Sequence, residues 1–488
     1  MLSASKRIWL IVISSIFVFV NGYFIYKEQF IFLGFPFIIL IGYLALYKMD
    51  LLLKIVLFFV PLSVSLRALD LDKKAGLDMS LPTEPILFGL LILFIIKLFQ
   101  GKAIDKNILR HPVTVAIIFN AAWILLTCIT STHPMISLKF LLSRVWLLVG
   151  FYFLLVELFK RSKNISQFFW LYLAGFLIVI IYTIVSHSGY NFDQESANWI
   201  MNPFFNDHTS YGAALAFVLP FLTYQLFSRE IIGTKKLLVM LLYLIVLVAL
   251  VLSYTRAAWV SVLGAFMVYL VLKLKIKWWV ITAFTLLIAV VLIGSWTRIS
   301  LVLESNKQDS STDLKEHVSS ISNVSSDASN LERLNRWKSA YEMFKVNPVF
   351  GWGPGVYAFE YAPFQRSYDK TIISTNAGDG GNAHSEYLGP LSETGILGSL
   401  SFIAIILTTT ISAVKTYKNA ASKRIKNLVL VAFLGLVSYY IHGILNNFLD
   451  TDKISSLFWG MTAVIVVADI YFKKMTDQEL DQSNDYVG

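Results

Sequence analysis

Long runs of apolar residues, separated by short polar segments, dominate the chain. A run of about 20 apolar residues is long enough to cross a bilayer as a helix. The pattern predicts about fourteen such spans. They lie near residues 8–26, 30–47, 51–66, 85–99, 113–131, 141–159, 167–186, 212–228, 237–253, 257–272, 278–296, 391–414, 427–445 and 454–472. The chain is therefore predicted to be an all-α polytopic membrane protein of about 12–14 transmembrane helices.

The longest polar interruption covers residues 297–390. It separates a bundle of about eleven spans (1–296) from about three C-terminal spans (391–474), and a polar tail follows at 475–488. Within the interruption, "LERLNRWKSAYEMFKV" has apolar residues at helical spacing, which predicts an amphipathic helix on the membrane or on the bundle. These residues are Leu331, Leu334, Trp337, Tyr341 and Phe344.

Composition and charge support this class. Only 15% of the residues are charged, whereas a soluble domain usually has about 25%. The net charge of +10 does not point to nucleic acid, because in a membrane protein the placement of the charges matters more than their sum. With a cytoplasmic N-terminus, more than half of the 41 lysines and arginines fall in short inner segments. Both termini are then cytoplasmic, and the segment 297–390 is external.

The lone cysteine, Cys128, excludes an internal disulfide and a cysteine-based metal site. Two arginines lie within or beside apolar runs, where a charge costs about 2.5–3.5 kcal/mol and should have a partner or a role. Arg256 could serve a ligand or snorkel to water at the outer interface. Arg144 could be functional or could pair with Glu157.

His384 is the most informative polar residue. It lies in "GDGGNAHSEYLGPLSETGILGSL", just before an apolar run, and an imidazole there can donate or accept a proton near neutral pH. A helix that starts near His384 would present its N–H groups to an anion. Glu386 and Glu393, seven residues apart, would share one face of that helix, and one of them could orient His384. The alternative is a capped helix end. His208 lies in a second polar cluster, "FFNDHTSYG".

Three further arginines, Arg333, Arg336 and Arg366, gather in the external segment. Arginine gives planar bidentate contacts to phosphate, so a pyrophosphate headgroup suits them, although a solvated charged face is the alternative. The sequence has no phosphate-binding loop of the Walker type, no H-E-x-x-H and no dinucleotide fingerprint.

Taken together, three stretches resemble the O-antigen ligase and polymerase superfamily of bacterial membrane proteins. They are "SYTRAAWVSVLGAF", with Ala257 where glycine is usual; "ERLNRWKSAYEMFKVNPVFGWGPGVY"; and "AHSEYLGPLSETGILG", with Ser385 where asparagine is common. "NDHTSYGAALAFVLPF" is also similar to a segment that precedes the family's core. The resemblance covers roughly residues 200–470.

The resemblance implies a GT-C-like glycosyltransferase that needs no metal or other cofactor. It would move a glycan from undecaprenyl pyrophosphate to a lipid A–core or other glycan or protein acceptor, on the outer face of the inner membrane, with inversion expected. The residues matched to catalysis are His384, Arg256 and Arg333. Those expected to bind pyrophosphate or acceptor are Arg336, Glu386, Glu393, Arg366, Arg144 and His208.

Other functions stay open at this point. A polysaccharide polymerase or a protein O-oligosaccharyltransferase would use the same donor. From other classes, a transporter of lipid-linked glycan and a structural membrane protein are the alternatives. A transporter would need charges along a cavity that reaches both faces, whereas the costly residues here crowd one predicted face.

Overall fold

The structure is a computed structural model that describes residues 4–27, 34–69, 79–101, 104–277, 294, 332–366, 374 and 381–485. The expected span at 278–296 lies outside these residues except for Gly294, and so does the polar stretch from residue 297 to residue 331.

The chain divides into two compact units, Met1–Val56 and Leu57–Gly488. The first unit holds α1 (Ala4–Tyr26), α2 (Phe35–Tyr47) and most of α3 (Met49–Phe59). In α2, apolar side chains such as Phe37 and Leu46 are exposed. A helix that is apolar along its whole length and exposes these side chains is suited to contact with lipid.

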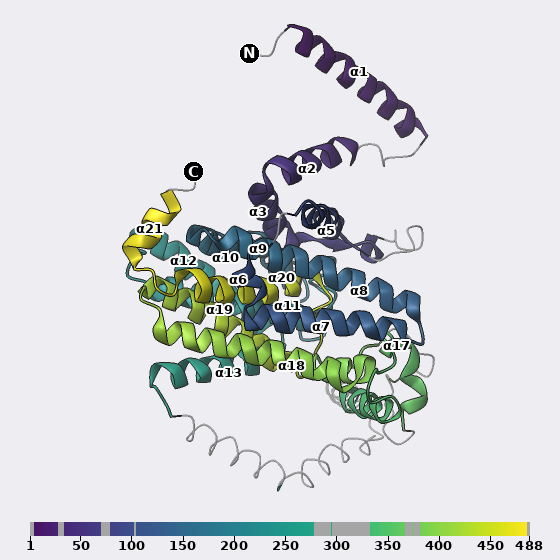
Figure 1. Ribbon diagram of the computed structural model, residues 1–488, viewed down its shortest axis with the longest axis vertical. Helices are drawn as coiled ribbons and strands as arrows, with labels where there is room; N and C mark the ends of the chain where they lie inside the picture. The colour runs from purple at the N-terminus through teal and green to yellow at the C-terminus, as the bar shows by residue number, and fades with distance from the viewer. Residues whose placement is uncertain are drawn as a thin grey trace. The chain divides into compact units, whose positions relative to one another are not determined.

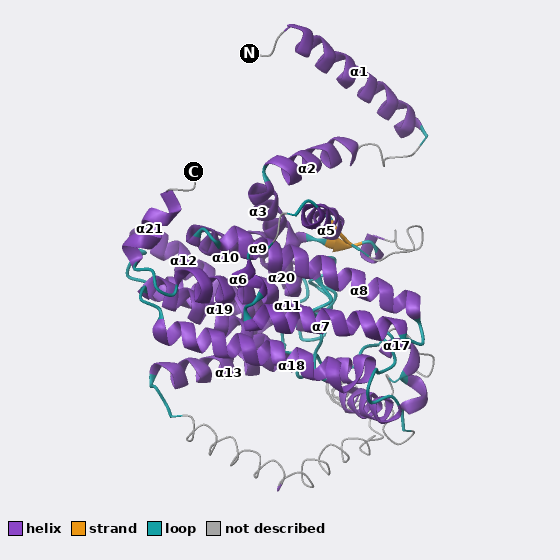
Figure 2. Cartoon of the chain, viewed as in Figure 1, coloured by secondary structure: helices purple, strands orange, loops and turns teal. Residues whose placement is uncertain are grey.

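The second unit is almost entirely helical (Figure 2). A single short antiparallel ribbon pairs Val64 with Leu81 and Ser65 with Ser80 within the described chain. Its elements in chain order are η2 (Val60–Leu62), β1 (Val64–Ser65), η3 (Arg67–Leu69), β2 (Ser80–Leu81), α5 (Thr83–Phe99), α6 (Lys106–Leu109), α7 (Pro112–Ile129), α8 (Pro134–Leu148), the π-helical turn η4 (Val149–Phe153), α9 (Leu154–Phe159), α10 (Ser162–Ser188), η5 (Ser196–Asn198), α11 (His208–Phe227), α12 (Gly233–Leu252), α13 (Arg256–Lys273), a helix over 332–346, α17 (Tyr357–Glu360), η6 (Ala362–Phe364), α18 (Leu388–Asn419), α19 (Lys423–His442), α20 (Asp452–Val467), the π-helical turn η8 (Ala468–Phe472) and α21 (Asp477–Asp485).

Among the described residues, nine helical stretches are long and apolar enough to cross a membrane. They are Pro112–Ile129, Pro134–Phe159, Ser162–Ser188, His208–Phe227, Gly233–Leu252, Arg256–Lys273, Leu388–Asn419, Lys423–His442 and Asp452–Phe472. Shorter apolar helices cover Ser14–Tyr26 and Phe35–Tyr47. The predicted fold class, an all-α polytopic membrane protein, is confirmed.

The candidate spans differ in how much protein surrounds them. In the stretch Asp452–Phe472, 83% of the apolar window is buried inside the protein, whereas in α13 the figure is 17%. α20 packs against α11, α18 and α19 and lies inside the bundle, with α13 at its edge (Figure 1). A helix with an apolar surface and little protein cover is suited to face lipid, so α13 belongs to the perimeter.

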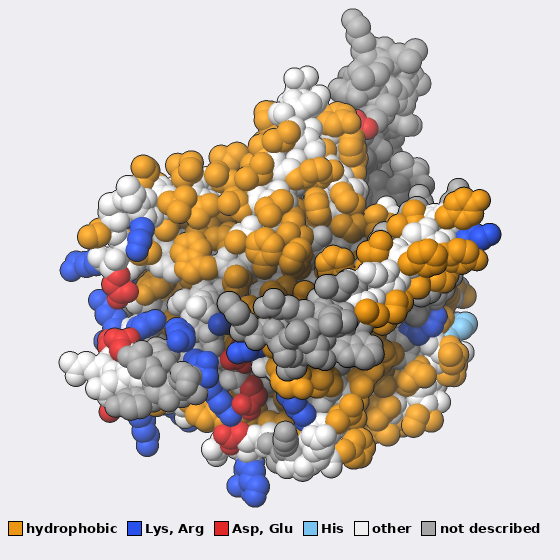
Figure 3. Space-filling view, turned by 90° about the horizontal axis from the view of Figure 1, so that it is seen from above, with side chains coloured by type: hydrophobic (Ala, Val, Ile, Leu, Met, Phe, Trp, Pro, Cys, Tyr) orange, Lys and Arg blue, Asp and Glu red, His pale blue; other side chains and the backbone are white. Residues whose placement is uncertain are grey.

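Basic side chains gather at one end of the second unit (Figure 3). α13 and α18 end there, and α19 begins there (Figure 1). The lysines and arginines at these helix ends and in the adjoining links are Lys273, Lys275, Lys277, Lys415, Lys418, Lys423, Arg424 and Lys426. At the opposite end lie α17 and the beginning of α18 (Figure 1).

The beginning of α18 is bent at Gly395, whose φ of 69° and ψ of −168° interrupt the helix. Glycine is required there because a Cβ would lie 2.1 Å from the backbone oxygen of Val349. The link after the 332–346 helix packs into this bend, and the N–H of Ile396 donates to the carbonyl of Pro348 at 2.9 Å. The bend therefore joins the link after the 332–346 helix to α18.

Candidate active site

The loop that precedes α18 holds His384. Its N–H donates to the Oδ1 of Asn382 at 3.0 Å, and its carbonyl accepts a hydrogen bond of 3.4 Å from the indole of Trp337. Its φ of 46° lies in the left-handed region, which is uncommon for a residue other than glycine. The expectation that a helix begins near His384 is wrong, because α18 begins at Leu388.

Glu386 therefore lies in a loop and not on the helix that carries Glu393. The two glutamates do not share a helical face, contrary to the expectation from their spacing. The cause is local: Ser385 Oγ accepts from the N–H groups of Tyr387 and Leu388, both at 3.3 Å, so the chain turns before the helix starts.

The predicted helix in the segment 297–390 is confirmed over 332–346, but its buried face is largely polar. The buried residues are Glu332, Asn335, Arg336, Ser339, Ala340 and Met343. Of the apolar residues that predicted the helix, Tyr341 is 52% exposed, and Leu331 lies outside the described residues. Leu334, Trp337 and Phe344 are half-buried, so the protein covers the apolar stripe only in part.

Arg336 connects this helix to the loop of His384. Its Nε donates to the carboxylate of Glu332 at 2.9 Å, and its Nη1 donates to the carbonyl of Asn382 at 3.1 Å. Its guanidinium also lies over the ring of Tyr361, 5.3 Å from the centroid. Both members of the ion pair are buried, so the pair is well shielded from water.

Arg333, one turn earlier on the same helix, lies among groups from other parts of the chain. His384, His208 and the carboxylate of Asp207 are its electrostatic neighbours. Burial lowers the pKa of Arg333, while Asp207 favours the charged guanidinium. Burial also lowers the pKa of His384, and the positive charges of Arg336 and Arg333 lower it further, to about 4. At neutral pH the His384 imidazole is therefore uncharged.

His442, the last residue of α19, lies in the same region. Its electrostatic neighbours include Asp207 and Arg333, and it lies beside the backbone of Ala257. This contact brings the beginning of α13 to the cluster. Arg256 is the first residue of α13 and its side chain is exposed. The prediction that Arg256 separates two close spans is confirmed, since α12 ends at Leu252.

A second group of contacts fixes the loop between α19 and α20. One carboxylate oxygen of Glu386 accepts from the Tyr439 hydroxyl at 2.6 Å and from the N–H groups of Phe448 and Leu449 at 2.8 and 2.9 Å. From the other side, Arg144 donates to the carbonyl of Leu449 at 2.9 Å. The considered pairing of Arg144 with Glu157 is wrong, because Glu157 pairs with Lys160.

The two remaining predicted residues, Glu393 and Arg366, make contacts with the segment that precedes α18. The carboxylate of Glu393 accepts from the N–H of Tyr357 at 3.1 Å and so holds the turn that follows "GWGPG". Arg366 pairs with Glu342 at 2.6 Å on the surface. The structure therefore brings together His384, Arg333, Arg336 and His208. Arg256 directly precedes Ala257 in the sequence, and the backbone of Ala257 lies beside His442.

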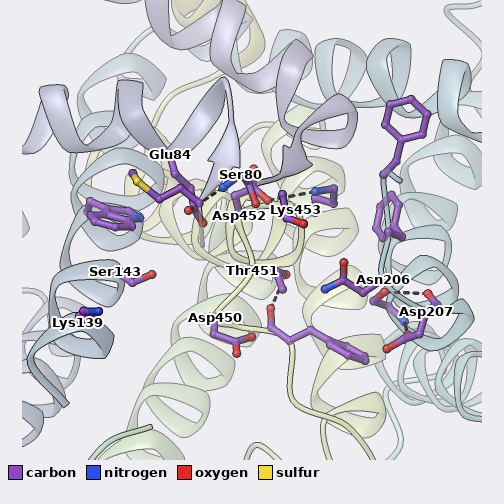
Figure 4. Close-up of a pocket in the computed structure, with 17 residues that line it drawn as sticks. Ser80, Glu84, Lys139, Ser143, Asn206, Asp207, Asp450, Thr451, Asp452 and Lys453 are labelled. Atoms are coloured by element: carbon purple, nitrogen blue, oxygen red, sulfur yellow. Dashed lines mark hydrogen bonds and ion pairs between the residues drawn. The ribbon is translucent and has the colours of Figure 1, made fainter. Parts of the chain in front are cut away.

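A cavity of about 370 Å³ opens beside the cluster, and Asp207 is one of its lining residues. Figure 4 shows Lys139 and Ser143 of α8 on one side, Asn206 and Asp207 on the other, and Asp450 and Thr451 between them. A smaller recess of about 80 Å³ is lined by Arg144, Asn382, Glu386 and Glu393. Asp450 lines both, so the recess next to the His384 loop and the larger cavity are neighbours.

Sequence reasoning missed Asp207, His442 and Asp450. Asp207 directly precedes His208 in the quoted polar cluster, and its side chain caps α11 by accepting from the N–H of Ser210 at 2.7 Å. A cap residue next to a candidate histidine was the available signal. No comparable signal marks Asp450, because its position depends on the contacts of Glu386 and Arg144.

Residues 239–403 match the family model described as O-antigen ligase. This match supports the resemblance of the chain to the O-antigen ligase superfamily. The match contains Arg256, Arg333 and His384, and it is narrower than the range of about 200–470 over which the sequence resembles the superfamily. No curated protein matches the sequence. The match supports a membrane ligase or glycosyltransferase of this class, for which a lipid-linked glycan donor and a glycan acceptor are expected in general.

Proposed function

We propose that the protein transfers a glycan from undecaprenyl pyrophosphate to a lipid A–core acceptor on the outer face of the inner membrane. The observation that carries this proposal is the meeting of His384 with Arg333 and Asp207 beside a 370 Å³ cavity, in a chain whose residues 239–403 match the O-antigen ligase family model. An uncharged imidazole next to a guanidinium suits a reaction that takes up a proton and releases an anion.

The reaction forms a bond between the acceptor oxygen and the anomeric carbon, and it breaks the bond from that carbon to the pyrophosphate. His384, whose imidazole is uncharged at neutral pH and so has one ring nitrogen free to accept, takes up the proton of the acceptor hydroxyl. The bonding electrons leave with the pyrophosphate, and the positive charges of Arg333 and Arg256 stabilise the developing charge. Attack from the face opposite to the leaving group inverts the anomeric centre, and no metal takes part in the proposed step.

The other predicted site residues receive two kinds of role in this proposal. Arg336, Glu386 and Arg144 act as positioning residues, since their contacts fix the loops that carry His384 and Asp450. His208, an electrostatic neighbour of Arg333, is assigned a contact to the pyrophosphate. Glu393 and Arg366 make contacts within the external segment that favour a structural role.

The proposed orientation places the basic helix ends in the cytoplasm and the His384 cluster outside. Short loops rich in lysine and arginine are typical of the cytoplasmic side, and such residues crowd one end of the second unit (Figure 3). His384 precedes α18, whereas Lys415 and Lys418 lie at the end of α18, on the opposite side of the bilayer. Both termini are then cytoplasmic.

The test is glycan transfer by the purified protein in lipid nanodiscs. Undecaprenyl-pyrophosphate oligosaccharide is supplied alone or with lipid A–core, and the wild type is compared with His384→Ala and Arg333→Gln. The matched control is His133→Ala, because the His133 side chain makes no capping hydrogen bond to α8 and pairs with Glu360 instead. We expect transfer to lipid A–core by the wild type and the control, and a loss of at least about 100-fold in His384→Ala, the usual size of a general-base contribution.

The other outcomes separate the alternatives. Lengthening of the donor in the absence of lipid A–core identifies a polymerase, and transfer only to a protein acceptor identifies an O-oligosaccharyltransferase. Movement of the donor across the bilayer without a new glycosidic bond identifies a transporter. Retention of the donor's anomeric configuration in the product contradicts direct displacement.

A further inference from the structure

The end of the second unit that lies opposite the His384 loop carries a group of exposed basic side chains (Figure 3). The exposed lysines at the ends of α13 and α18, in the link after α13 and at the beginning of α19 are Lys273, Lys275, Lys277, Lys415, Lys418 and Lys423. We call this group the basic surface. Within the described ranges, no carboxylate forms an ion pair with any of these lysines. Because its charges have one sign and the protein does not neutralise them, the basic surface attracts anions.

The basic surface lies where spanning helices end. α13, α18 and α19 are long and apolar enough to cross a bilayer, and both α13 and α18 pack against α19. The ammonium group of Lys273 lies over the ring of Tyr269, 5.3 Å from the centroid, and Tyr417 of α18 is an electrostatic neighbour of this lysine. Tyrosine rings beside lysines at the ends of spanning helices are typical of the level of the lipid headgroups. The basic surface is therefore suited to contact lipid phosphates.

An acidic segment of the same chain already occupies part of this end. The helix α21 lies there (Figure 1), and the carboxylate of Asp481 pairs with Arg424 at 3.2 Å. Asp477 accepts a hydrogen bond from the hydroxyl of Ser422, the residue that caps α19. Carboxylate oxygens of the chain thus accept from a guanidinium and a hydroxyl, which are also good donors to phosphate oxygens.

Few contacts hold α21 in place. It spans 9 residues, whereas an isolated helix needs about 12–15 to be stable in water. Among its side chains at 477–482, Leu480 is the buried one. The Asp481 side chain of the ion pair is 70% exposed, and an exposed ion pair contributes little to stability and is weakened by salt. Anions gathered at a membrane surface can therefore displace α21 from Arg424.

Phospholipid headgroups are the anions that the end of a spanning helix meets. Each Lys or Arg near an anionic membrane surface strengthens binding by about fivefold. The carboxylates of α21 at 477–482 are Asp477, Glu479 and Asp481, and Glu479 accepts hydrogen bonds from Thr476 of its own segment. α21 therefore neutralises only part of the positive charge at this end and leaves the lysines of the basic surface to the lipid.

We propose that the basic surface binds the headgroups of anionic phospholipids, and that α21 is an intramolecular competitor that these lipids displace from Arg424. The lipid phosphate accepts from the lysines and from Arg424 in place of the Asp481 carboxylate, and no covalent bond forms or breaks. The basic surface lies at the end of α18 opposite His384, so its lipid binding does not depend on the proposed glycan transfer.

Native mass spectrometry of the full-length protein resolves single bound lipids and tests the selectivity. Phosphatidylglycerol and phosphatidylcholine with the same acyl chains are added separately to the protein in detergent. We expect the first phosphatidylglycerol to bind at least about fivefold more tightly than the first phosphatidylcholine at low ionic strength, and the ratio to shrink as salt is added. Equal dissociation constants at low ionic strength overturn the proposal, and this comparison needs no variant.

Substitution of two lysines locates the binding. Lys418→Gln/Lys423→Gln should weaken the binding of phosphatidylglycerol by roughly 5–25-fold and leave that of phosphatidylcholine unchanged. The matched control is Lys345→Gln/Arg366→Gln, which removes the same charge from two exposed side chains that pair with Glu342 in another part of the protein. If the control weakens phosphatidylglycerol binding as much, the binding follows net charge and the assignment to the basic surface is wrong.

A spin label on α21 tests its displacement. In a Cys128→Ala background, the label is attached at Gln482→Cys, an exposed position of α21, or at the exposed control position Val346→Cys on the 332–346 helix. In phosphatidylcholine nanodiscs the label on α21 should be ordered, and in phosphatidylglycerol nanodiscs it should become mobile, while the control keeps its spectrum. Leu480→Ser provides the reference spectrum of a released α21. An unchanged spectrum of the α21 label in phosphatidylglycerol contradicts the displacement.

Asp481→Asn tests the competition from the other side. It removes the contact of α21 with Arg424 and should tighten the binding of phosphatidylglycerol. Glu360→Gln is the matched control, because it removes the same charge from a carboxylate that pairs with His133 instead. Equal tightening in both variants would reflect net charge alone and would contradict a competitor role of α21.

Inorganic phosphate distinguishes a lipid headgroup from a soluble anion. In phosphatidylcholine nanodiscs, it should leave the label on α21 as ordered as sodium chloride of the same ionic strength does. Release of α21 by inorganic phosphate, with no further release by phosphatidylglycerol, overturns the assignment to lipid. Loss of the proposed glycan transfer would not affect these binding measurements, so a failure of the proposed function and a failure of the lipid site are distinguishable.

Discussion

The carboxylate of Glu386 accepts a hydrogen bond of 2.6 Å from the hydroxyl of Tyr439, a residue 53 positions later in the chain. Both residues are buried, and the same carboxylate oxygen also accepts from the N–H groups of Phe448 and Leu449. One side chain before α18 thereby fixes the loop after α19. The loops that carry His384 and Asp450 form a single connected structure.

The first prediction concerns this connection. Tyr439→Phe removes one hydrogen bond to a buried carboxylate and should lower the free energy of unfolding by about 1.5–3 kcal/mol. Glu386→Ala removes all three acceptor contacts and should cost more. Unfolding in lipid nanodiscs, followed by circular dichroism, measures both. The matched control is Tyr190→Phe, because Tyr190 is 46% exposed. In the double variant Tyr439→Phe/Glu386→Ala, the loss of unfolding free energy should differ from the sum of the two single losses. A loss equal to that sum would show that the contact between Tyr439 and Glu386 carries no energy.

The second prediction concerns pH. His384 has a pKa of about 4 in the folded protein and an ordinary value of 6.5. Because the uncharged imidazole is the proposed base, the transfer rate should change little between about pH 8 and pH 5 on account of His384 and should fall only near pH 4. An acid limb near pH 6.5 in the pH–rate profile contradicts the assignment.

The lowered pKa of His384 also affects the stability of the protein. Between pH 6.5 and about 4 the unfolded chain binds a proton at His384 and the folded protein does not, so this residue makes the protein less stable as the pH falls through that window. Arg333→Gln removes one of the positive charges that lower the pKa, and the acid limb of any remaining activity should move upward. Arg366→Gln is the control, since Arg366 pairs with Glu342 on the surface.

The fold class was readable from the sequence because apolar runs of membrane length leave few alternatives. The close pair α12 and α13 and the helix over 332–346 were also predictable from local pattern. The buried face of that helix was not, since Glu332, Asn335 and Arg336 are polar and pack against segments far away in the chain. Periodicity identifies a helix, but it does not identify which face the rest of the protein covers.

The candidate site shows the same limit. His384 and Arg333 stood out because a histidine and arginines are unusual in so apolar a chain. Asp450 did not stand out, because an aspartate in a loop is ordinary. Its relation to the cavity depends on long-range contacts, such as that of Arg144 with Leu449, 305 residues later. No local sequence pattern records such contacts.

The third prediction concerns the buried ion pair of Arg336 and Glu332. Arg336→Met leaves a buried carboxylate without its partner and should cost about 3–5 kcal/mol of stability. It also removes the hydrogen bond to Asn382, two residues before His384, so the transfer rate should fall even at temperatures where the protein stays folded. Arg336→Lys should restore part of the stability but less of the rate, because an ammonium lacks the planar fork of a guanidinium. Equal losses of stability and rate in both variants contradict a positioning role.

The fourth prediction concerns orientation. In a Cys128→Ala background, Val346→Cys places an exposed thiol in the external segment, and Lys418→Cys places one at the opposite end of α18. A membrane-impermeant maleimide should label Val346→Cys in right-side-out vesicles and Lys418→Cys in inverted vesicles. The reverse pattern would place the His384 cluster in the cytoplasm and contradict the proposed function.

The last prediction concerns the bend in α18. Gly395 has a φ of 69° with ψ near 180°, a conformation that costs other residues about 1–3 kcal/mol, and a Cβ there would also collide with the Val349 carbonyl. Gly395→Ala should therefore lower stability by more than the backbone conformation alone accounts for. Gly233 provides the control: its φ is also positive, at 60°, but nothing lies within 4 Å of the position of a Cβ.

Gly233→Ala should cost only the strain of the left-handed backbone, about 1–2 kcal/mol. The additional loss in Gly395→Ala measures how firmly the external segment is attached to α18, because the colliding carbonyl belongs to the link that follows the 332–346 helix. That helix carries Arg333 and Arg336, so Gly395→Ala should also reduce transfer although it lies outside the cluster. If the two alanine variants lose equal stability and Gly395→Ala keeps the wild-type transfer rate, the bend does not position the arginines.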